Sequence, residues 1–153
     1  MELSQYGELF LSESREHVSA INQHLLALEK DAGSREAVDR LFRSVHTIKG
    51  MSATMGYKAV ADLTHEMENL LDRIRQGLVR PTGELLDLLF NATDALERAI
   101  EAAVAEGDEE LPGLDELMER LRRAAGDDRL FDLYAPQVML QPAAAATGVT
   151  FIY

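Results

Sequence analysis

The sequence contains no cysteine and no tryptophan, and only 15 of its 153 residues are lysine or arginine. The absence of cysteine excludes a disulfide framework, a thiolate metal site and a cysteine nucleophile. Because 27 residues are aspartate or glutamate, the formal net charge is −12. A nucleic-acid-binding surface needs basic residues to replace phosphate counterions, and anionic membrane surfaces also attract basic segments. The charge therefore argues against nucleic acid and membrane as partners.

Long apolar runs are missing as well. No segment approaches the ~20 consecutive apolar residues that cross a bilayer. Residues 1–4 (MELS) are acidic, whereas a signal peptide begins basic and then becomes apolar. With 46% hydrophobic and 27% charged residues, the composition is that of an ordinary globular domain. We therefore expect a soluble cytoplasmic protein with one compact core.

Apolar residues recur every three or four positions in long segments, which is typical of amphipathic helices. We expect helices at about residues 3–30, 35–54, 57–76 and 83–105, and a shorter one at about 114–125. The first four helices are separated by glycines: Gly33, which is suited to a turn with positive φ, Gly56 and Gly77. The side chains of Ser34 and Thr82 are suited to cap the helices that follow them. Short connections between long helices favour antiparallel neighbours. The predicted fold is all-α: an up-down antiparallel four-helix bundle with a fifth, shorter C-terminal helix.

The character of the sequence changes after residue 126. Residues 127–153 contain two prolines and a run of four alanines, which is typical of a linker. Residues 148–153 have strand character without a partner strand elsewhere in the chain. We place one domain at residues 1–126 and interpret residues 127–153 as a linker or the start of a truncated following region.

One histidine has unusual neighbours on its helix. The inward stripe of the second helix passes through Phe42 and Val45, and His46 lies one position off it. Residues three before, three after and four after His46 share its face, and these are Arg43, Lys49 and Gly50. The two cations favour a neutral imidazole and would stabilise an anion attached to it. A glycine within a helix costs about 1 kcal/mol relative to alanine, and close approach of a partner surface would explain it.

The third helix carries polar residues that match this position. If the second and third helices are antiparallel about Gly56, His65 and Glu68 lie level with His46. A carboxylate, two imidazoles and a lysine then converge on one edge of the bundle. A hydrogen bond from one ring nitrogen of His46 to Glu68 would fix the tautomer and leave the other nitrogen with a free lone pair.

Three interpretations of this cluster stay open from the residues alone. The first is a polar seam of the kind that any bundle exposes. The second is a metal site, but a two-metal bundle needs Glu-x-x-His on two helices. Asp62 and His65 supply one weak half, while the residue three before His46 is Arg43. The third is a histidine that accepts a phosphoryl group, with Lys49 countering the phosphate charge.

Residues 41–50 (LFRSVHTIKG), followed by 51–57 (MSATMGY), closely resemble the phosphoacceptor motif of histidine phosphotransfer (HPt) domains. Residues 63–72 (LTHEMENLLD) resemble the second signature of that family. The nearest resemblance is to the N-terminal phosphoacceptor domain of chemotaxis histidine kinases of the CheA type. It covers about residues 1 to 125. It implies that His46 is phosphorylated, that Glu68 orients its ring, and that Lys49 and His65 complete the polar network.

The resemblance also implies partners. A separate ATP-binding kinase domain would phosphorylate His46 with Mg-ATP, and an aspartate on a response regulator of the CheY or CheB type would receive the phosphoryl group. Arg43 and Gly50 are the residues that we expect at the docking surface. The domain itself would be a monomeric phosphoryl carrier without a cofactor, and its parent a protein-histidine kinase. The alternatives are an HPt module of a non-chemotaxis phosphorelay and a module that only docks partners.

Overall fold

The computed structural model describes residues 2–107 and 111–126. Within these residues the chain is helical, without a strand. The helices are α1 (Glu2–Lys30), α2 (Arg35–Met55), α3 (Lys58–Arg75), α4 (Gly83–Glu106) and α5 (Leu114–Ala125). Each lies within one residue of its predicted bounds. The predicted linker at 127–153, and with it the strand-like end at 148–153, lies outside the described residues.

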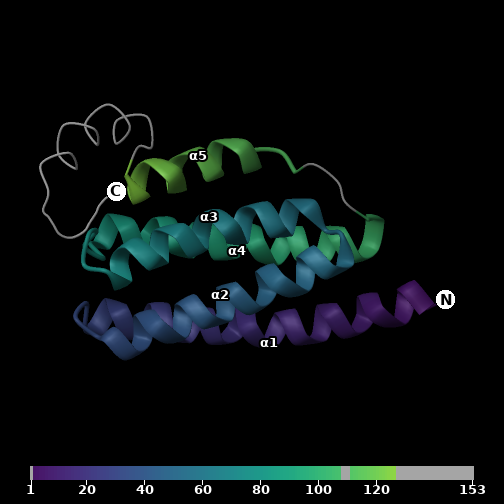
Figure 1. Ribbon diagram of the computed structural model, residues 1–153, viewed down its shortest axis with the longest axis horizontal. Helices are drawn as coiled ribbons and strands as arrows, with labels where there is room; N and C mark the ends of the chain where they lie inside the picture. The colour runs from purple at the N-terminus through teal and green to yellow at the C-terminus, as the bar shows by residue number, and fades with distance from the viewer. Residues whose placement is uncertain (1, 108–110, 127–153) are drawn as a thin grey trace, which may run out of the picture.

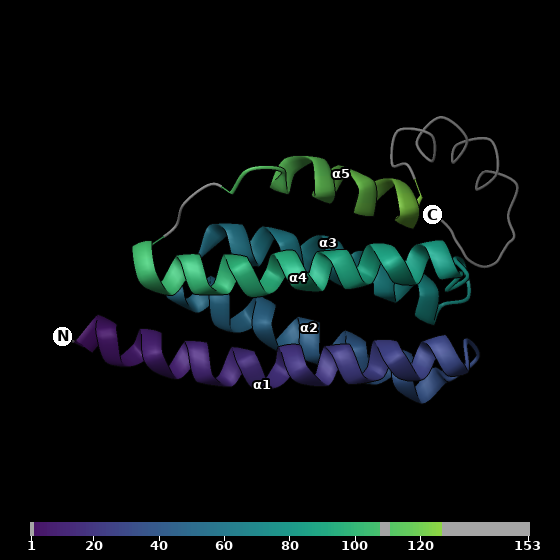
Figure 2. The same cartoon turned by 180° about the vertical axis from the view of Figure 1, so that it is seen from behind.

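Four long helices form an antiparallel bundle. Helices α1 to α4 alternate in direction, each packs against the next, and α1 closes the ring by packing against α4 (Figure 1). Helix α5 lies outside this ring and covers α3 and α4, as the reverse view also shows (Figure 2). The predicted fold class is thus confirmed. None of the helices in the described part of the chain is long and apolar enough to span a membrane.

Local signals in the sequence set the helix ends. The hydroxyl oxygen of Ser34 accepts a hydrogen bond from the backbone N–H of Ala37 at 3.2 Å, and Thr82 caps α4 in the same way. Gly56 ends α2 with φ +76°, a conformation that favours glycine. The expectation that Gly33 has positive φ is wrong. Its N–H instead donates to the Asp31 carboxylate at 3.1 Å, and this side-chain contact makes the turn.

The core runs along the axis of the ring. The large side chains that are almost wholly buried come from all four long helices: Ile21, Leu25, Leu28, Leu41, Ile48, Leu63, Met67, Leu70, Leu71, Leu89, Leu96 and Ile100. Phe42, which the sequence placed on the inward stripe, is only partly buried and packs against the edge of this core.

The core predicts a large stability difference between two leucines. Leu70 on α3 is 0% exposed, whereas Leu26 on α1 is 52% exposed. Leu70→Ala should reduce the free energy of unfolding by about 2–5 kcal/mol, because it removes buried methyl groups and leaves a cavity. Leu26→Ala should change it by less than about 0.5 kcal/mol. Urea denaturation of both variants measures the difference, and equal midpoints would contradict the assigned core.

Candidate functional site

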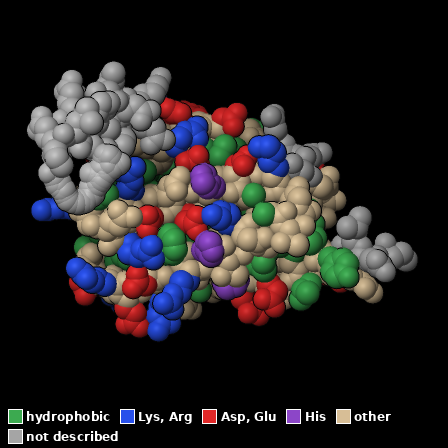
Figure 3. Space-filling view, viewed as in Figure 1, with side chains coloured by type: hydrophobic (Ala, Val, Ile, Leu, Met, Phe, Trp, Pro, Cys, Tyr) green, Lys and Arg blue, Asp and Glu red, His purple; other side chains and the backbone are tan. Residues whose placement is uncertain are grey.

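Three polar side chains meet where α2 and α3 pack against each other. Nδ1 of His46 makes a hydrogen bond with Oε2 of Glu68. Nζ of Lys49 donates to the other carboxylate oxygen, Oε1, at 2.5 Å. On the face formed by α2 and α3, histidine side chains lie beside basic and acidic ones (Figure 3). We call His46, Lys49 and Glu68 the polar triplet.

The helical hairpin brings the triplet together. His46 and Lys49 are three positions apart, so both project from the same face of α2. Gly56 reverses the chain, and α3 then runs back alongside α2. Glu68 follows His46 by 22 positions and Lys49 by 19, which places it opposite both. The sequence predicted this level arrangement.

The members of the triplet differ in exposure. The Glu68 side chain is 11% exposed and the Lys49 side chain 29%, whereas the His46 side chain is 62% exposed. Burial alone would raise the pKa of Glu68, but hydrogen bonds from Lys49 and His46, with their charges, lower that pKa below its ordinary value of 4.5. Glu68 is therefore ionised at neutral pH.

An ionised carboxylate assigns the tautomer of the histidine. Glu68 has no proton to donate, so the bond between them requires Nδ1 of His46 to carry the hydrogen. In the neutral ring, Nε2 then keeps its lone pair. Because the ring is mostly exposed and its Nδ1 side faces the protein, Nε2 is directed to solvent. The arrangement produces an oriented, accessible nitrogen nucleophile.

The ring of His46 also contacts an aromatic side chain. Its plane is nearly parallel to that of Phe42, with an angle of 7° and ring centroids 6.1 Å apart. The guanidinium of Arg75, from α3, lies over the Phe42 ring at 4.1 Å from the centroid. Sequence reasoning missed both contacts. The four-residue spacing of Phe42 and His46 was the available signal, because such residues are neighbours on a helix surface.

The other predicted site residues lie around the triplet rather than in it. His65 is exposed, and its Nε2 lies 3.4 Å from Nδ2 of Asn69 on the same helix. The described hydrogen bonds therefore do not join His65 to the triplet, and its role in the network stays a prediction. Arg43 and Gly50 are both exposed on α2. A Cβ atom at Gly50 would meet nothing within 4 Å, so the surface there is open.

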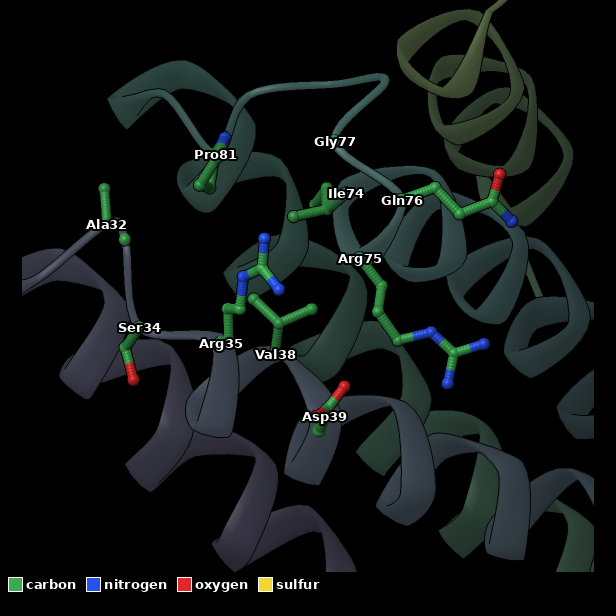
Figure 4. A pocket seen from close by; sticks show the side chains of 11 residues that line it. Ala32, Ser34, Arg35, Val38, Asp39, Ile74, Arg75, Gln76, Gly77 and Pro81 are labelled. Atoms are coloured by element: carbon green, nitrogen blue, oxygen red, sulfur yellow. The ribbon is translucent and has the colours of Figure 1, made fainter.

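Residues 2–107 and 111–126 contain no cluster that fits the metal interpretation. In that part of the chain, no group of three or more histidine, aspartate or glutamate side chains is arranged to hold a metal ion. A hollow of about 290 Å³ lies elsewhere, where the α1–α2 and α3–α4 turns meet (Figure 4). Arg35, Asp39 and Arg75 line it, and no triplet residue does.

Fold and site together define a class of protein: an antiparallel helical bundle that presents one histidine, oriented by a buried carboxylate, from a helix surface. The family described as the Hpt domain matches residues 5–124. The chain belongs to this family. This confirms the resemblance stated from the sequence motifs.

Relatives known by sequence are chemotaxis proteins. The chain is 47% identical to CheA of Bacillus subtilis over 108 residues, which cover 71% of this chain and 16% of that protein. It is 31% identical to CheA of Klebsiella aerogenes over 149 residues, covering 97% of this chain and 23% of that protein. The chain thus spans less than a quarter of the length of these relatives.

Solved structures share the fold. The phosphorylated P1 domain of CheA3 in complex with CheY6 from R. sphaeroides matches with a TM-score of 0.74 and 31% identity, over 80% of this chain and 96% of that chain. The solution structure of the histidine phosphotransfer domain of CheA matches with a TM-score of 0.70 and 34% identity, over 77% and 90% of the two chains.

The electrostatics of the triplet predict the titration of Glu68. In the native protein, its side-chain carboxyl carbon should titrate by NMR with a midpoint below 4.5. Lys49→Met should raise that midpoint, because the hydrogen bond and positive charge that most favour the carboxylate are removed. Lys30→Met, an exposed change of the same charge on α1, should leave it in place.

The same shift has a consequence for stability. Since the folded pKa of Glu68 is depressed, its contribution to stability is fully present above pH 4.5 and is lost as the pH falls through the lower folded pKa.

In the NMR titration, an unchanged Glu68 midpoint in Lys49→Met would show that Lys49 does not hold the carboxylate ionised.

Proposed function

We propose that this chain is the phosphoryl-accepting and phosphoryl-transferring domain of a two-component chemotaxis histidine kinase. His46 receives a phosphoryl group from a separate ATP-binding kinase domain and passes it to an aspartate of a response regulator of the CheY or CheB type. The observation that carries this proposal is the exposed side chain of His46, whose Nδ1 is bonded to Glu68 and whose Nε2 is thereby left for the phosphoryl group.

The acceptance step is a displacement at phosphorus. The Nε2 lone pair of His46 attacks the γ-phosphorus of ATP, the Nε2–P bond forms, and the bond to the β–γ bridging oxygen breaks with its electron pair leaving on ADP. Nδ1 keeps its hydrogen throughout. With both nitrogens substituted, the ring carries a positive charge, and the ionised Glu68 beside Nδ1 stabilises that charge.

Transfer is a second displacement at phosphorus, in which His46 is the leaving group. A carboxylate oxygen of the regulator's aspartate attacks the phosphorus, the Nε2–P bond breaks, and its electron pair returns to Nε2. Lys49 lies one turn from His46 on the same helix face, where its ammonium offsets the negative charge added to the site. Glu68 keeps the Nδ1–H tautomer in place, so the ring returns to its starting state.

Comparison with a complex supports the partner. The similar P1 domain of CheA3 was solved phosphorylated and bound to CheY6. For this chain we place regulator docking on the surface of α2 around Arg43 and Gly50. ATP and Mg²⁺ bind to the separate kinase domain. The present chain works as a monomeric, cytoplasmic carrier without a cofactor of its own.

Labelling by a kinase tests the acceptor. With Mg-ATP and the excised kinase core of a chemotaxis histidine kinase, the chain should acquire an acid-labile, base-stable phosphoryl label. His46→Gln should remain folded by circular dichroism, because His46 is exposed, and should acquire none. His24→Gln, on α1, is the matched control and should be labelled as the wild type is. Label on His46→Gln, or none on the folded wild type with several kinase cores, would refute the proposal.

Gly50 tests the docking surface separately from stability. Gly50→Leu should raise the free energy of unfolding by up to about 1 kcal/mol, because leucine is the better helix former and its side chain meets open space. Transfer from phosphorylated His46 to the regulator should nevertheless slow, since the added side chain occupies the surface that the regulator approaches. A melting curve and a transfer time course on one sample measure both effects. Transfer at the wild-type rate would place docking elsewhere.

A further inference from the structure

One hydrogen bond does not fix the orientation of the His46 ring. The bond to Glu68 anchors Nδ1, but the ring can still swing about that anchor and move Nε2. The χ2 torsion of histidine is broad, so the backbone supplies little restraint. With 62% of the side chain exposed, core packing supplies little more. A second contact must define the plane of the ring.

Phe42 provides that contact. Its ring precedes His46 by one helical turn and lies parallel to it within 7°, with centroids 6.1 Å apart. This separation and angle fall in the range of offset aromatic stacking. Phe42 is itself held by packing against the core. The stack fixes the plane of His46, whereas Glu68 fixes one point in that plane.

Arg75 extends this arrangement from α2 to α3. Its guanidinium lies over the Phe42 ring at 4.1 Å, a distance typical of a cation–π contact. Asp72 accepts a hydrogen bond from Nη2 of Arg75 at 2.7 Å and another from Gln76 at 2.7 Å, which holds the arginine from its own helix. Arg75 projects from α3 over α2 in Figure 4.

We propose that Phe42, clamped by Arg75, is a positioning residue that holds the His46 ring in the plane from which Nε2 can accept a phosphoryl group. This inference rests on the proposed function. The role of Phe42 and Arg75 differs from that of Lys49 and Glu68. Lys49 and Glu68 set the charge of the site and the tautomer of His46, whereas Phe42 and Arg75 set the plane of the ring. The aromatic ring of Phe42 is the feature that matters, rather than its apolar bulk.

Two phenylalanine variants separate ring from bulk. Phe42→Leu should slow labelling of His46 by about 2- to 10-fold, the effect expected from losing one aromatic stack. Phe42→Tyr keeps the ring and should restore the rate to within about 2-fold of wild type. Phe90→Leu is the matched control, because Phe90 on α4 is also a partly buried phenylalanine packed against the core. Phe90→Leu should be labelled at the wild-type rate.

The imidazole ¹⁵N chemical shifts of the unphosphorylated protein give a readout that does not depend on phosphotransfer. In the wild type, neutral His46 should show Nδ1 carrying hydrogen and Nε2 without it. In Phe42→Leu, a ring that swings out of its plane no longer aligns Nδ1–H with Glu68, so the bond that selects this tautomer weakens. The Nε2–H tautomer should therefore increase, and the Nε2 signal should move accordingly. Arg75→Met should shift it in the same direction by a smaller amount. Arg98→Met, which removes an exposed charge on α4, should not shift it.

The outcomes divide cleanly. Unchanged ¹⁵N shifts in Phe42→Leu and Arg75→Met would overturn the positioning role whether or not the chain is phosphorylated. Equal slowing by Phe42→Leu and Phe90→Leu would also overturn it, because a general loss of packing would explain the rates. Shifts that move in both variants while the wild type takes no label would support the ring restraint and refute the proposed function instead. If Phe42→Leu fails to fold, Arg75→Met decides.

Discussion

The carboxylate of Glu68 is the interaction on which the site depends. A charged group with 11% of its side chain exposed is unfavourable unless donors replace the lost water, and here two donors do so. Lys49 and His46 keep it ionised, and its ionisation in turn fixes which nitrogen of His46 carries the hydrogen. One buried charge therefore links α2 to α3 and selects the reactive face of the imidazole.

The bundle separates the residues that stabilise it from those that act. Leucine, isoleucine and methionine side chains between the helices supply the buried core, while His46, Arg43 and Gly50 are exposed on the outer surface of α2. A side chain mounted on a well-packed helix is held more rigidly than one on a loop. The exposed residues can therefore change with little effect on the fold, and the core can hold them in place without touching a partner.

Much of this could be predicted from the sequence because its signals were local. Ser34 and Thr82 mark helix starts, Gly56 marks a helix end, and the turn at Gly56 places Glu68 level with His46. The rest depends on side-chain rotamers and tertiary packing. Helical spacing put Glu68 at one edge of the bundle and did not reveal its burial, nor that Lys49 is bonded to it. Arg75 reaches Phe42 from another helix, and no spacing rule within one helix predicts that contact.

The site lies wholly within the helical hairpin formed by α2 and α3. Its hydrogen bonds join residues only 19 and 22 positions apart, so they close short loops of the chain. Closing such a short loop costs little chain entropy, and the cost rises only slowly with loop length. The α2–α3 hairpin alone positions His46, and the packing of the other helices makes unfolding of the bundle cooperative. Variation in α1, α4 or α5 can thus tune the lifetime of the folded state while the chemistry of the hairpin stays the same.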